Sequence, residues 1–246
     1  MTDTRQAILR YTLRHGINRI TPLAALIDMD GTLYDSMLGH CEAWYQMMTE
    51  NGINVTSEEF YLYEGRTGAS TIDLIVKREL GRDATDEEKT SMYERKAQLF
   101  RLMPPVNVMP GAQSMVSILM SRGITPVLVT GSGQVSLINR LSNDFPNAFA
   151  PERRITSRDV IHGKPHPEPY LKAMSLVGVQ PTQSLAIDNA PLGIRSAADS
   201  GAFTIGVTTG PISPQTLRNA GADIVFDSMP SLAQALPDLL DQLSTQ

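Results

Sequence analysis

The sequence predicts an α/β fold, in which a Rossmann-like parallel sheet has helices on both faces and carries an inserted helical cap domain. Two observations lead to this fold class. After residue 104, short apolar runs alternate with helical stretches, the pattern of right-handed βαβ crossovers. Between residues 38 and 103 the pattern is helical, and no run there resembles a strand. We therefore expect an α/β core of residues 1–37 and 104–246, interrupted by a helical domain of residues 38–103.

The first twenty residues contain four arginines and a stripe of apolar residues at helical spacing, Leu9, Leu13, Ile17 and Ile20. This pattern predicts an amphipathic helix that docks on the core, and it fits a transit peptide less well. The apolar run at 23–27 follows and is the first predicted strand.

Glycines and prolines divide the insertion into helical segments. The segments predicted to be helical are 38–51, 57–63, 70–80 and 86–102. Ser57 is the predicted N-cap of the second segment, since a serine hydroxyl can accept a hydrogen bond from a free amide of the first turn. Gly65-Arg66-Thr67-Gly68 is predicted to be a turn, and Pro104-Pro105 ends the insertion.

Beyond the insertion, β-rich runs and helical stretches alternate to the end of the chain. The runs predicted to be strands are 124–130, 184–188, 202–207 and 222–226. The stretches predicted to be helices are 111–122, 134–143, 167–177, 190–200, 213–220 and 231–243. Strands separated by helices pair in parallel, so the sheet is expected to be covered on both faces.

Polar side chains follow three of the predicted strands where each strand ends. The residues at these ends are Asp28 and Asp30, Thr130 and Ser132, and Asp188 and Asn189. Ligands of such sheets bind beyond the carboxyl ends of the strands, so we expect these side chains to converge. Lys164, in the loop "HGKPHPEPY", is expected at the same edge.

This combination of groups suits phosphoryl transfer. Two nearby carboxylates repel each other unless a cation binds them, and Mg²⁺ prefers oxygen ligands. The hydroxyl of Thr130 and the ammonium of Lys164 suit phosphate oxygens. Asp28 could then attack as the nucleophile and form an aspartyl-phosphate. Asp30 could protonate the leaving group and later deprotonate water.

Composition and charge limit the partners and the cellular compartment that we expect. The chain has 246 residues and a formal net charge of −5, which argues against a nucleic-acid partner. Its single cysteine, Cys41, excludes an intrachain disulfide and favours a reducing compartment. No apolar run approaches the roughly 20 residues of a membrane span. We therefore expect a cytoplasmic monomer, without a membrane partner, that acts on a small phosphorylated substrate.

Four segments resemble, in the right order, the motifs of the haloacid dehalogenase superfamily of phosphotransferases: "DMDGTLYDS", "VLVTGSG", "HGKPHPEPY" and "AIDNAPLGIRSA". The insertion stands where this superfamily places a helical cap. The resemblance implies Asp28 as nucleophile, and Asp30 as acid/base and as Mg²⁺ ligand through its main-chain carbonyl. It implies Thr130 as phosphate anchor and Lys164 as the link between nucleophile and phosphate. His40 stands where β-phosphoglucomutase-like members have a histidine, which implies a role at the hinge.

Two positions depart from the family pattern. Asn189 stands where the fourth motif usually has a second acid, so it would bind Mg²⁺ through a neutral oxygen, with Asp188 supporting Lys164. In the turn "YEGRTGAS", Glu64 and Gly68 stand where β-phosphoglucomutase has a lysine and an arginine. We interpret Glu64 as a cap residue that reaches the Mg²⁺ ion when the cap closes, which leaves little room for a sugar.

The segments "EGRTGASTI", "VTGSGQ" and "NAPLG" resemble the inorganic pyrophosphatases that lie near β-phosphoglucomutase in this superfamily. This resemblance implies pyrophosphate as the substrate. The implied Mg²⁺ site consists of Asp28, Asp30, Asn189 and Glu64. The implied contacts to the substrate are Arg66, Gly131 and Ser132, and Ser132 would also support the ligands.

Three alternatives remain. The first is a β-phosphoglucomutase or a phosphatase of small sugar phosphates with the same fold. The second is dinucleotide binding by "GSGQVS", although Ser136 replaces the third glycine and no acid ends a following strand. The third is a binding protein without catalysis, against which the presence of both Asp28 and Asp30 argues.

Overall fold

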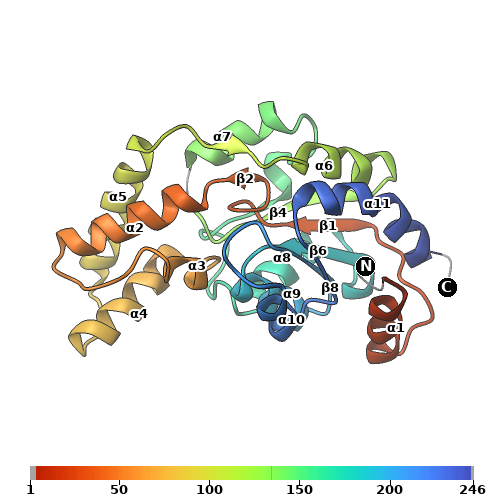
Figure 1. Ribbon diagram of the computed structural model, residues 1–246, viewed down its shortest axis with the longest axis horizontal. Helices are drawn as coiled ribbons and strands as arrows, with labels where there is room; N and C mark the ends of the chain where they lie inside the picture. Colours follow the sequence, from red (N-terminus) through yellow and green to blue (C-terminus); the bar gives the residue numbers. More distant parts are fainter. Residues whose placement is uncertain (1–3, 134, 245–246) are drawn as a thin grey trace.

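The computed structural model describes residues 4–133 and 135–244. Six parallel strands form the central sheet in the order β5-β4-β1-β6-β7-β8, and a two-stranded antiparallel ribbon, β2-β3, lies beside it. The strands of the central sheet are β1 (Ala24–Ile27), β4 (Thr125–Val129), β5 (Arg154–Ile155), β6 (Ser184–Asp188), β7 (Phe203–Val207) and β8 (Ile224–Phe226). Figure 1 shows this sheet between two layers of helices. The predicted fold class is thus confirmed.

Successive side chains of β1 point to opposite faces of the sheet, and each face packs against helices. Ala25 and Ile27 belong to the apolar cluster under α6 and α11, whereas Ala24 and Leu26 belong to the cluster under α8. All four residues are completely buried, as expected for a central parallel strand. The core helices after the insertion are α6 (Ala112–Ser121), α7 (Val135–Asp144), α8 (Glu168–Val177), α9 (Pro191–Asp199), α10 (Pro214–Ala220) and α11 (Met229–Ser244). Residue 134, where the predicted helix 134–143 begins, lies outside the described residues.

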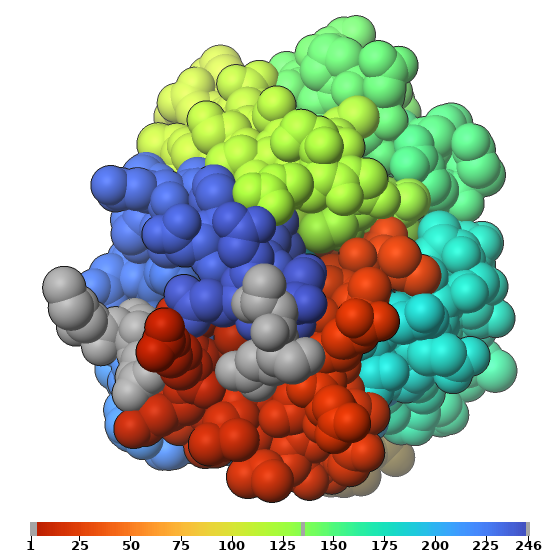
Figure 2. Space-filling view, turned by 90° about the vertical axis from the view of Figure 1, so that its right-hand side faces the viewer, coloured from red at the N-terminus to blue at the C-terminus, as the bar shows by residue number. Residues whose placement is uncertain are grey.

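The N-terminal helix α1 (Thr4–His15) docks as expected, but not through the predicted stripe. Leu9 and Leu13 are 52% and 73% exposed, and the buried face is Ala7, Ile8, Tyr11 and Thr12. The prediction was wrong for Leu9 and Leu13 because specific partners select the buried face: Tyr11 donates a hydrogen bond to the carbonyl of Gly201 at 2.7 Å and packs on Phe203. Figure 2 shows the N-terminal segment and α11 side by side at the end of the molecule away from the insertion.

Four helices make up the insertion, at the left of Figure 1: α2 (Met37–Glu50), α3 (Phe60–Tyr63), α4 (Gly68–Leu80) and α5 (Asp86–Leu102). Among the described residues between α2 and α5 there is no strand, as predicted. Ser57 is not an N-cap, because α3 begins at Phe60 and its N-cap is Glu59. Thr56 and Glu59 form a reciprocal pair of hydrogen bonds, in which the amide of Glu59 donates to the Thr56 hydroxyl instead of to Ser57. The division into two domains at residues 37/38 and 103/104 stays a prediction.

Three short strands were not predicted. They are β2 (Tyr34–Asp35), β3 (Asn107–Val108) and β5, and each has two residues, too few to show a periodic pattern. The pair β2-β3 joins the two connections between core and insertion, because β2 precedes the insertion and β3 follows it. Among the described residues no helix is long and apolar enough to cross a membrane.

Candidate active site

The ends of β1 and β6 bring two carboxylates to one ammonium group. Lys164 Nζ lies 2.5 Å from Asp28 Oδ1 and 2.8 Å from Asp188 Oδ2, and it also donates to the carbonyl of Val129 at 3.0 Å. The Lys164 side chain is 1% exposed, so its charge is stabilised almost entirely by these partners. Burial opposes the charge, but Asp188 and Asp28 together keep the pKa of Lys164 well above its usual range.

Asp188 is held by the core. Its Oδ2 also accepts a hydrogen bond from the Tyr170 hydroxyl at 2.6 Å, and its Oδ1 accepts one from the amide of Ala190 at 3.0 Å. A Cβ on Gly193, in the first turn of α9, would collide with this carboxylate. Asp188 thus sits beside Lys164, where the sequence analysis placed it. Tyr170 was missed, because a tyrosine on a buried helix face resembles an ordinary core residue.

Asp28 has one oxygen bound and one free. Oδ1 faces Lys164, whereas Oδ2 is buried and has no hydrogen-bond partner among the described residues. Burial raises the pKa of Asp28 to about 8; Lys164 lowers it, and Asp188 and Asp30 raise it. The single Lys164 ammonium is therefore shared by two buried carboxylates, which favours the binding of a further cation beside Asp28.

Asp30 points away from Lys164, into a chain of buried polar groups. Its Oδ1 accepts a hydrogen bond from Ser36 Oγ at 2.7 Å and lies 2.8 Å from His40 Nε2. On the other side of the ring, Lys96 Nζ is 2.6 Å from His40 Nδ1. Since an ammonium can only donate, neutral His40 carries its proton on Nε2 and donates to Asp30. Burial would raise the pKa of Asp30, but His40 and Ser36 more than offset it and lower it.

Lys96 is a candidate residue that sequence reasoning missed. It lies on α5, is 3% exposed, and packs over the rings of Trp44 and Phe100. Burial lowers its pKa to about 8, although Asp30 acts in the opposite direction. A lysine among charged residues on an amphipathic helix gives no sign of burial. Because Lys96 is far from His40 in the sequence, the contact between their side chains could not be predicted.

Glu64 reaches from the insertion to the core. The Nδ2 atom of Asn189 donates to both carboxylate oxygens of Glu64, at 3.0 and 3.1 Å, while Asn189 Oδ1 accepts from Thr32 Oγ1 at 3.1 Å. Burial, together with Asp28 and Asp188, raises the pKa of Glu64 well above its usual range. The two positions that depart from the family pattern, Glu64 and Asn189, therefore contact each other directly.

Main chains meet closely where the insertion covers the core. A Cβ on Gly131 would collide with the carbonyl of Gly65, and one on Gly163 would come within 2.7 Å of the Thr67 methyl group. Tyr93 of α5 adds a hydrogen bond across the same boundary, since its hydroxyl accepts from the amide of Gly133 at 3.1 Å. The described conformation is thus closed over the strand ends.

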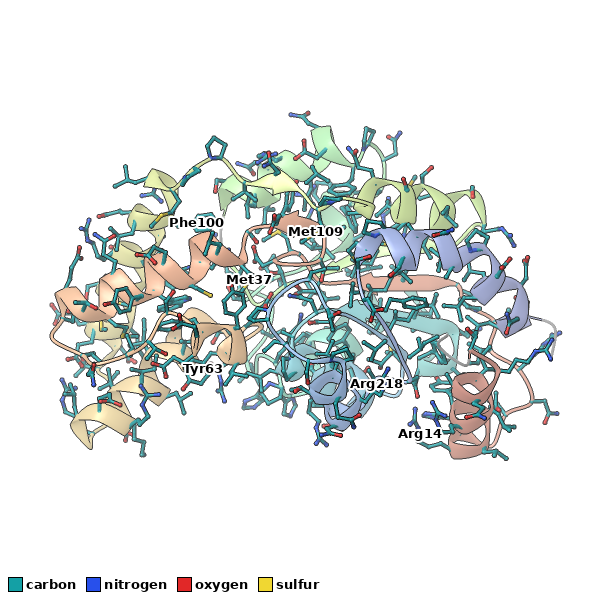
Figure 3. All side chains as sticks on the ribbon, in the orientation of Figure 1. Arg14, Met37, Tyr63, Phe100, Met109 and Arg218 are labelled. Carbon is teal, nitrogen blue, oxygen red and sulfur yellow. The ribbon has the colours of Figure 1, made fainter. Side chains whose placement is uncertain are left out.

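A cavity of about 60 Å³ lies between the two parts. Its polar walls include Asp28, Asp30, Glu64, Arg66, Thr130, Gly131 and Ser132. The insertion adds an aromatic wall of Trp44, Phe60, Tyr63 and Tyr93. Figure 3 labels two lining residues, Met37 and Tyr63, at the junction of insertion and sheet. Except for Asn189, Asp188 and Lys164, all residues predicted for the site line this cavity. Asn189 contacts the lining residue Glu64 and Lys164 contacts the lining residue Asp28, while Asp188 lies behind Lys164.

The donor set is compatible with Mg²⁺, although acids alone do not make the site. In residues 4–133 and 135–244, no three His, Cys, Asp or Glu side chains form a metal-binding group by themselves. The unpartnered Oδ2 of Asp28 and the Glu64 carboxylate are oxygen donors beside an excess of negative charge. Asn189 offers one further oxygen, Oδ1, which here accepts from Thr32 while Nδ2 faces Glu64. Oxygen donors of this kind suit Mg²⁺. Asp30 would contribute its main-chain carbonyl, because Oδ1 of its carboxylate is held by Ser36 and His40 and the carboxyl group would be needed as acid and base.

A family model for haloacid dehalogenase-like hydrolases matches residues 23–201. The chain belongs to this family. The hydrolase is also similar to a solved structure from Bacteroides vulgatus that has the provisional name β-phosphoglucomutase. The two share 42% identity and a TM-score of 0.94, over 99% of this chain and 98% of the other.

Two curated relatives carry phosphatase names. Validoxylamine A 7′-phosphate phosphatase from Streptomyces hygroscopicus subsp. limoneus is 29% identical, over 75% of the hydrolase and 85% of the relative. Hexitol phosphatase A from Escherichia coli (strain K12) is 26% identical, over 83% and 90%. These comparisons show a haloacid dehalogenase-like hydrolase that is similar to β-phosphoglucomutase-like proteins and to sugar-phosphate phosphatases. They favour the sugar-phosphate alternative of the sequence analysis over pyrophosphate.

Proposed function

We propose that this hydrolase removes phosphate from a small phosphorylated sugar or polyol through an aspartyl-phosphate on Asp28. The observation that carries the proposal is the state of Asp28. Lys164 holds its Oδ1 at 2.5 Å, and its Oδ2 is left without a partner among the described residues, at the wall of the cavity. One oxygen fixed and the other free is the arrangement that a carboxylate nucleophile needs. The names of the relatives support the substrate class.

In the first step, Asp28 Oδ2 attacks phosphorus, and the bond between phosphorus and the leaving oxygen breaks. Asp30 gives its proton to that oxygen. The lowered pKa of Asp30 describes the ligand-free site, and an incoming phosphate anion would raise it towards the protonated form. In the second step, Asp30 takes a proton from water as the water attacks phosphorus, and the bond between phosphorus and Asp28 breaks. Thr130 and Lys164 would hold the phosphate oxygens in both steps.

Asp28, the main-chain carbonyl of Asp30, Asn189 and Glu64 would hold Mg²⁺. When bound, the ion neutralises charge that otherwise repels an anionic substrate from an anionic nucleophile. The raised pKa values of Asp28 and Glu64 support this assignment, because both carboxylates lack sufficient positive charge around them.

Pyrophosphate is the second candidate substrate, and Glu64 is the observation that favours it. A carboxylate that projects from the insertion to Asn189 would repel the phosphate of a sugar phosphate but would attract a metal complex. The closed cavity of about 60 Å³ also suits a compact substrate, whereas a hexose phosphate would require the insertion to move.

Release of inorganic phosphate by the purified protein, measured with Mg²⁺ over a panel of substrates, tests both candidates. The panel contains hexose and hexitol phosphates, β-glucose 1-phosphate and pyrophosphate. A kcat/KM at least about tenfold higher for a sugar or polyol phosphate supports the main proposal, and the reverse ratio supports pyrophosphate. Conversion of β-glucose 1-phosphate to glucose 6-phosphate without phosphate release would indicate a mutase. No turnover of any phosphorylated substrate would overturn the proposal.

A further inference from the structure

A second cavity, of about 520 Å³, lies on the other side of the turn that carries Arg66. Three of its lining residues come from the insertion and the other nine from the core. The insertion contributes Arg66, Thr67 and Ser70, and the core contributes residues 161–167, Arg195 and Asp199. Of these residues, Arg66 alone also lines the active-site cavity, so this side chain separates the two spaces.

The second cavity has unused positive charge. The Nε atom of Arg66 is buried and has no hydrogen-bond partner among the described residues. Arg195, on α9, has a side chain that is 54% exposed, and its one recorded partner, Asp199, is 3.9 Å away. At that distance a surface ion pair contributes little, so both guanidinium groups keep donors for a ligand. Lys164 contributes no charge of its own here, because Asp28 and Asp188 neutralise it.

Neutral donors point to the same kind of ligand. His166 Nδ1 accepts a hydrogen bond from the amide of Glu168 at 3.1 Å, so neutral His166 carries its proton on Nε2, which remains available to donate. Thr67 Oγ1 accepts a hydrogen bond from the Ser70 amide, and its hydroxyl hydrogen is free to donate outwards. His162 lies against His166, with ring centroids 4.8 Å apart.

The acids nearby do not cancel this surplus of donors. Glu168 is occupied, because its carboxylate accepts from the amides of Ile161 and His162 at 2.9 and 2.8 Å and pairs with Lys172 at 2.9 Å. Asp199 is the one acid among the lining residues. Two guanidinium groups against one carboxylate leave a net positive cavity.

We propose that this cavity is a second oxyanion site, which binds inorganic phosphate or the phosphate group of a small metabolite. Arg66 and Thr67 would bind the anion from the insertion, while Arg195 and His166 would bind it from the core. Guanidinium groups suit phosphate oxygens because they offer paired donors in a fixed plane. A bound anion would tie the insertion to the core. It would also compete with the active-site cavity for Arg66.

Titration of the metal-free protein with inorganic phosphate, followed by calorimetry, tests this site. Without metal, the excess of carboxylates around Asp28 disfavours an anion in the active site. We expect saturable binding in the wild type, and at least about tenfold weaker binding in R195Q, the cost of one charge-assisted hydrogen-bonding group. The matched control is R218Q, which removes an exposed arginine of α10 and should bind phosphate like the wild type. H166Q removes a different donor and should also weaken the binding of phosphate.

Sulfate should compete with phosphate, whereas chloride at matched ionic strength should not. Equal affinities in R195Q and R218Q, absence of saturable binding in the wild type, or equal displacement by chloride would each overturn the proposal. The titration involves no turnover, so its outcome is independent of the substrate that the hydrolase acts on.

Discussion

On the core side of the active-site cavity, Lys164 lies between two carboxylates that the strand ends hold in place. On the insertion side, Glu64 and Lys96 reach the boundary from α3–α4 and α5, and burial shifts the pKa of each towards its neutral form. The core groups thus stabilise one another, with both carboxylates at strand ends and Lys164 on the loop before α8. The insertion groups become favourable only through contact with the core or with a ligand. The core side therefore holds the reacting groups, whereas the insertion side controls how the cavity closes over them. Mutations on the two sides should differ in their effects on stability and on activity.

The largest effect is expected for Lys164→Met. It leaves Asp28 and Asp188 as buried carboxylates without their shared cation, which costs about 3–5 kcal/mol of folding free energy. Activity should fall by about a thousandfold or more, because Lys164 also orients the nucleophile. Phosphate release and urea denaturation measure the two losses. Lys172→Met is the control, since the exposed Lys172 binds Glu168 and the carbonyl of Asp159 and touches no residue of the active site. A K164M protein with normal turnover would refute the role of the core ion pair.

Lys96→Met tests the insertion side. It removes the donor that fixes the His40 tautomer, so we expect kcat to fall about ten- to a hundredfold, as when a partner that orients a working histidine is lost. The free energy of unfolding at pH 7 should change much less than kcat does. The lowered pKa of Lys96 means that its charge opposes folding below pH 8, and this cost disappears as the pH rises towards 10.5.

Lys89→Met, on the same helix, provides the comparison for Lys96→Met, because Lys89 pairs at the surface with Asp73 at 3.2 Å. Steady-state kinetics and thermal unfolding of both variants separate a catalytic effect from a loss of structure. If K96M and K89M had the same kcat, the chain from Lys96 through His40 to Asp30 would have no catalytic role.

Glu64→Gln should show opposite effects on stability and on metal binding. A carboxyl group whose pKa is raised by folding destabilises the folded state as pH rises above its ordinary value of 4.5. E64Q should therefore gain stability relative to the metal-free wild type from about pH 4.5 upwards, and show no gain at pH 4. Its half-saturating Mg²⁺ concentration should rise about tenfold. Thermal unfolding across pH, with and without Mg²⁺, measures both effects, and exposed Glu94→Gln is the control.

The smallest effect is expected within the insertion, far from the cavity. Thr85 and Glu88 form a capping box at the start of α5. Thr85→Ala should cost about 1 kcal/mol in urea denaturation and leave kcat unchanged, because the lost bonds are local. Thr90→Ala on the same helix, where the hydroxyl only donates to the carbonyl of Asp86, should cost less. A large loss of kcat in T85A would mean that the stability of α5 itself controls the position of Lys96.

Sequence reasoning located the core side of the site well, because a parallel sheet brings its strand ends to one edge. Asp28, Asp188 and Lys164 needed only the right order of strands to be placed together. Tyr170 and Lys96 could not be found in this way, since their roles depend on which face of a helix turns inwards. The comparison with the family pattern singled out Glu64 and Asn189 as ligands of one Mg²⁺ ion, but it did not predict the direct hydrogen bonds between them.

The errors have the same origin. Leu9 and Leu13 form a regular stripe, yet the packing of Tyr11 on Gly201 selects a different face of α1. At α3, the pairing of Thr56 with Glu59 fixes the start of a four-residue helix that local propensity cannot define. Periodicity predicts that a helix is amphipathic, but the partner decides which residues are buried.

The close approach of Gly131 to the carbonyl of Gly65 means that one methyl group could act as a wedge. In a G131A chain, the insertion could not reach its present position without a shift of the main chain, so the insertion and the core would stay partly separated. The added group is a single methyl that meets main-chain atoms, and it leaves every ionisable group unchanged. G131A would supply an open form for crystallisation with phosphorylated compounds. The largest compound that binds to it would show the size of substrate that the active-site cavity can admit.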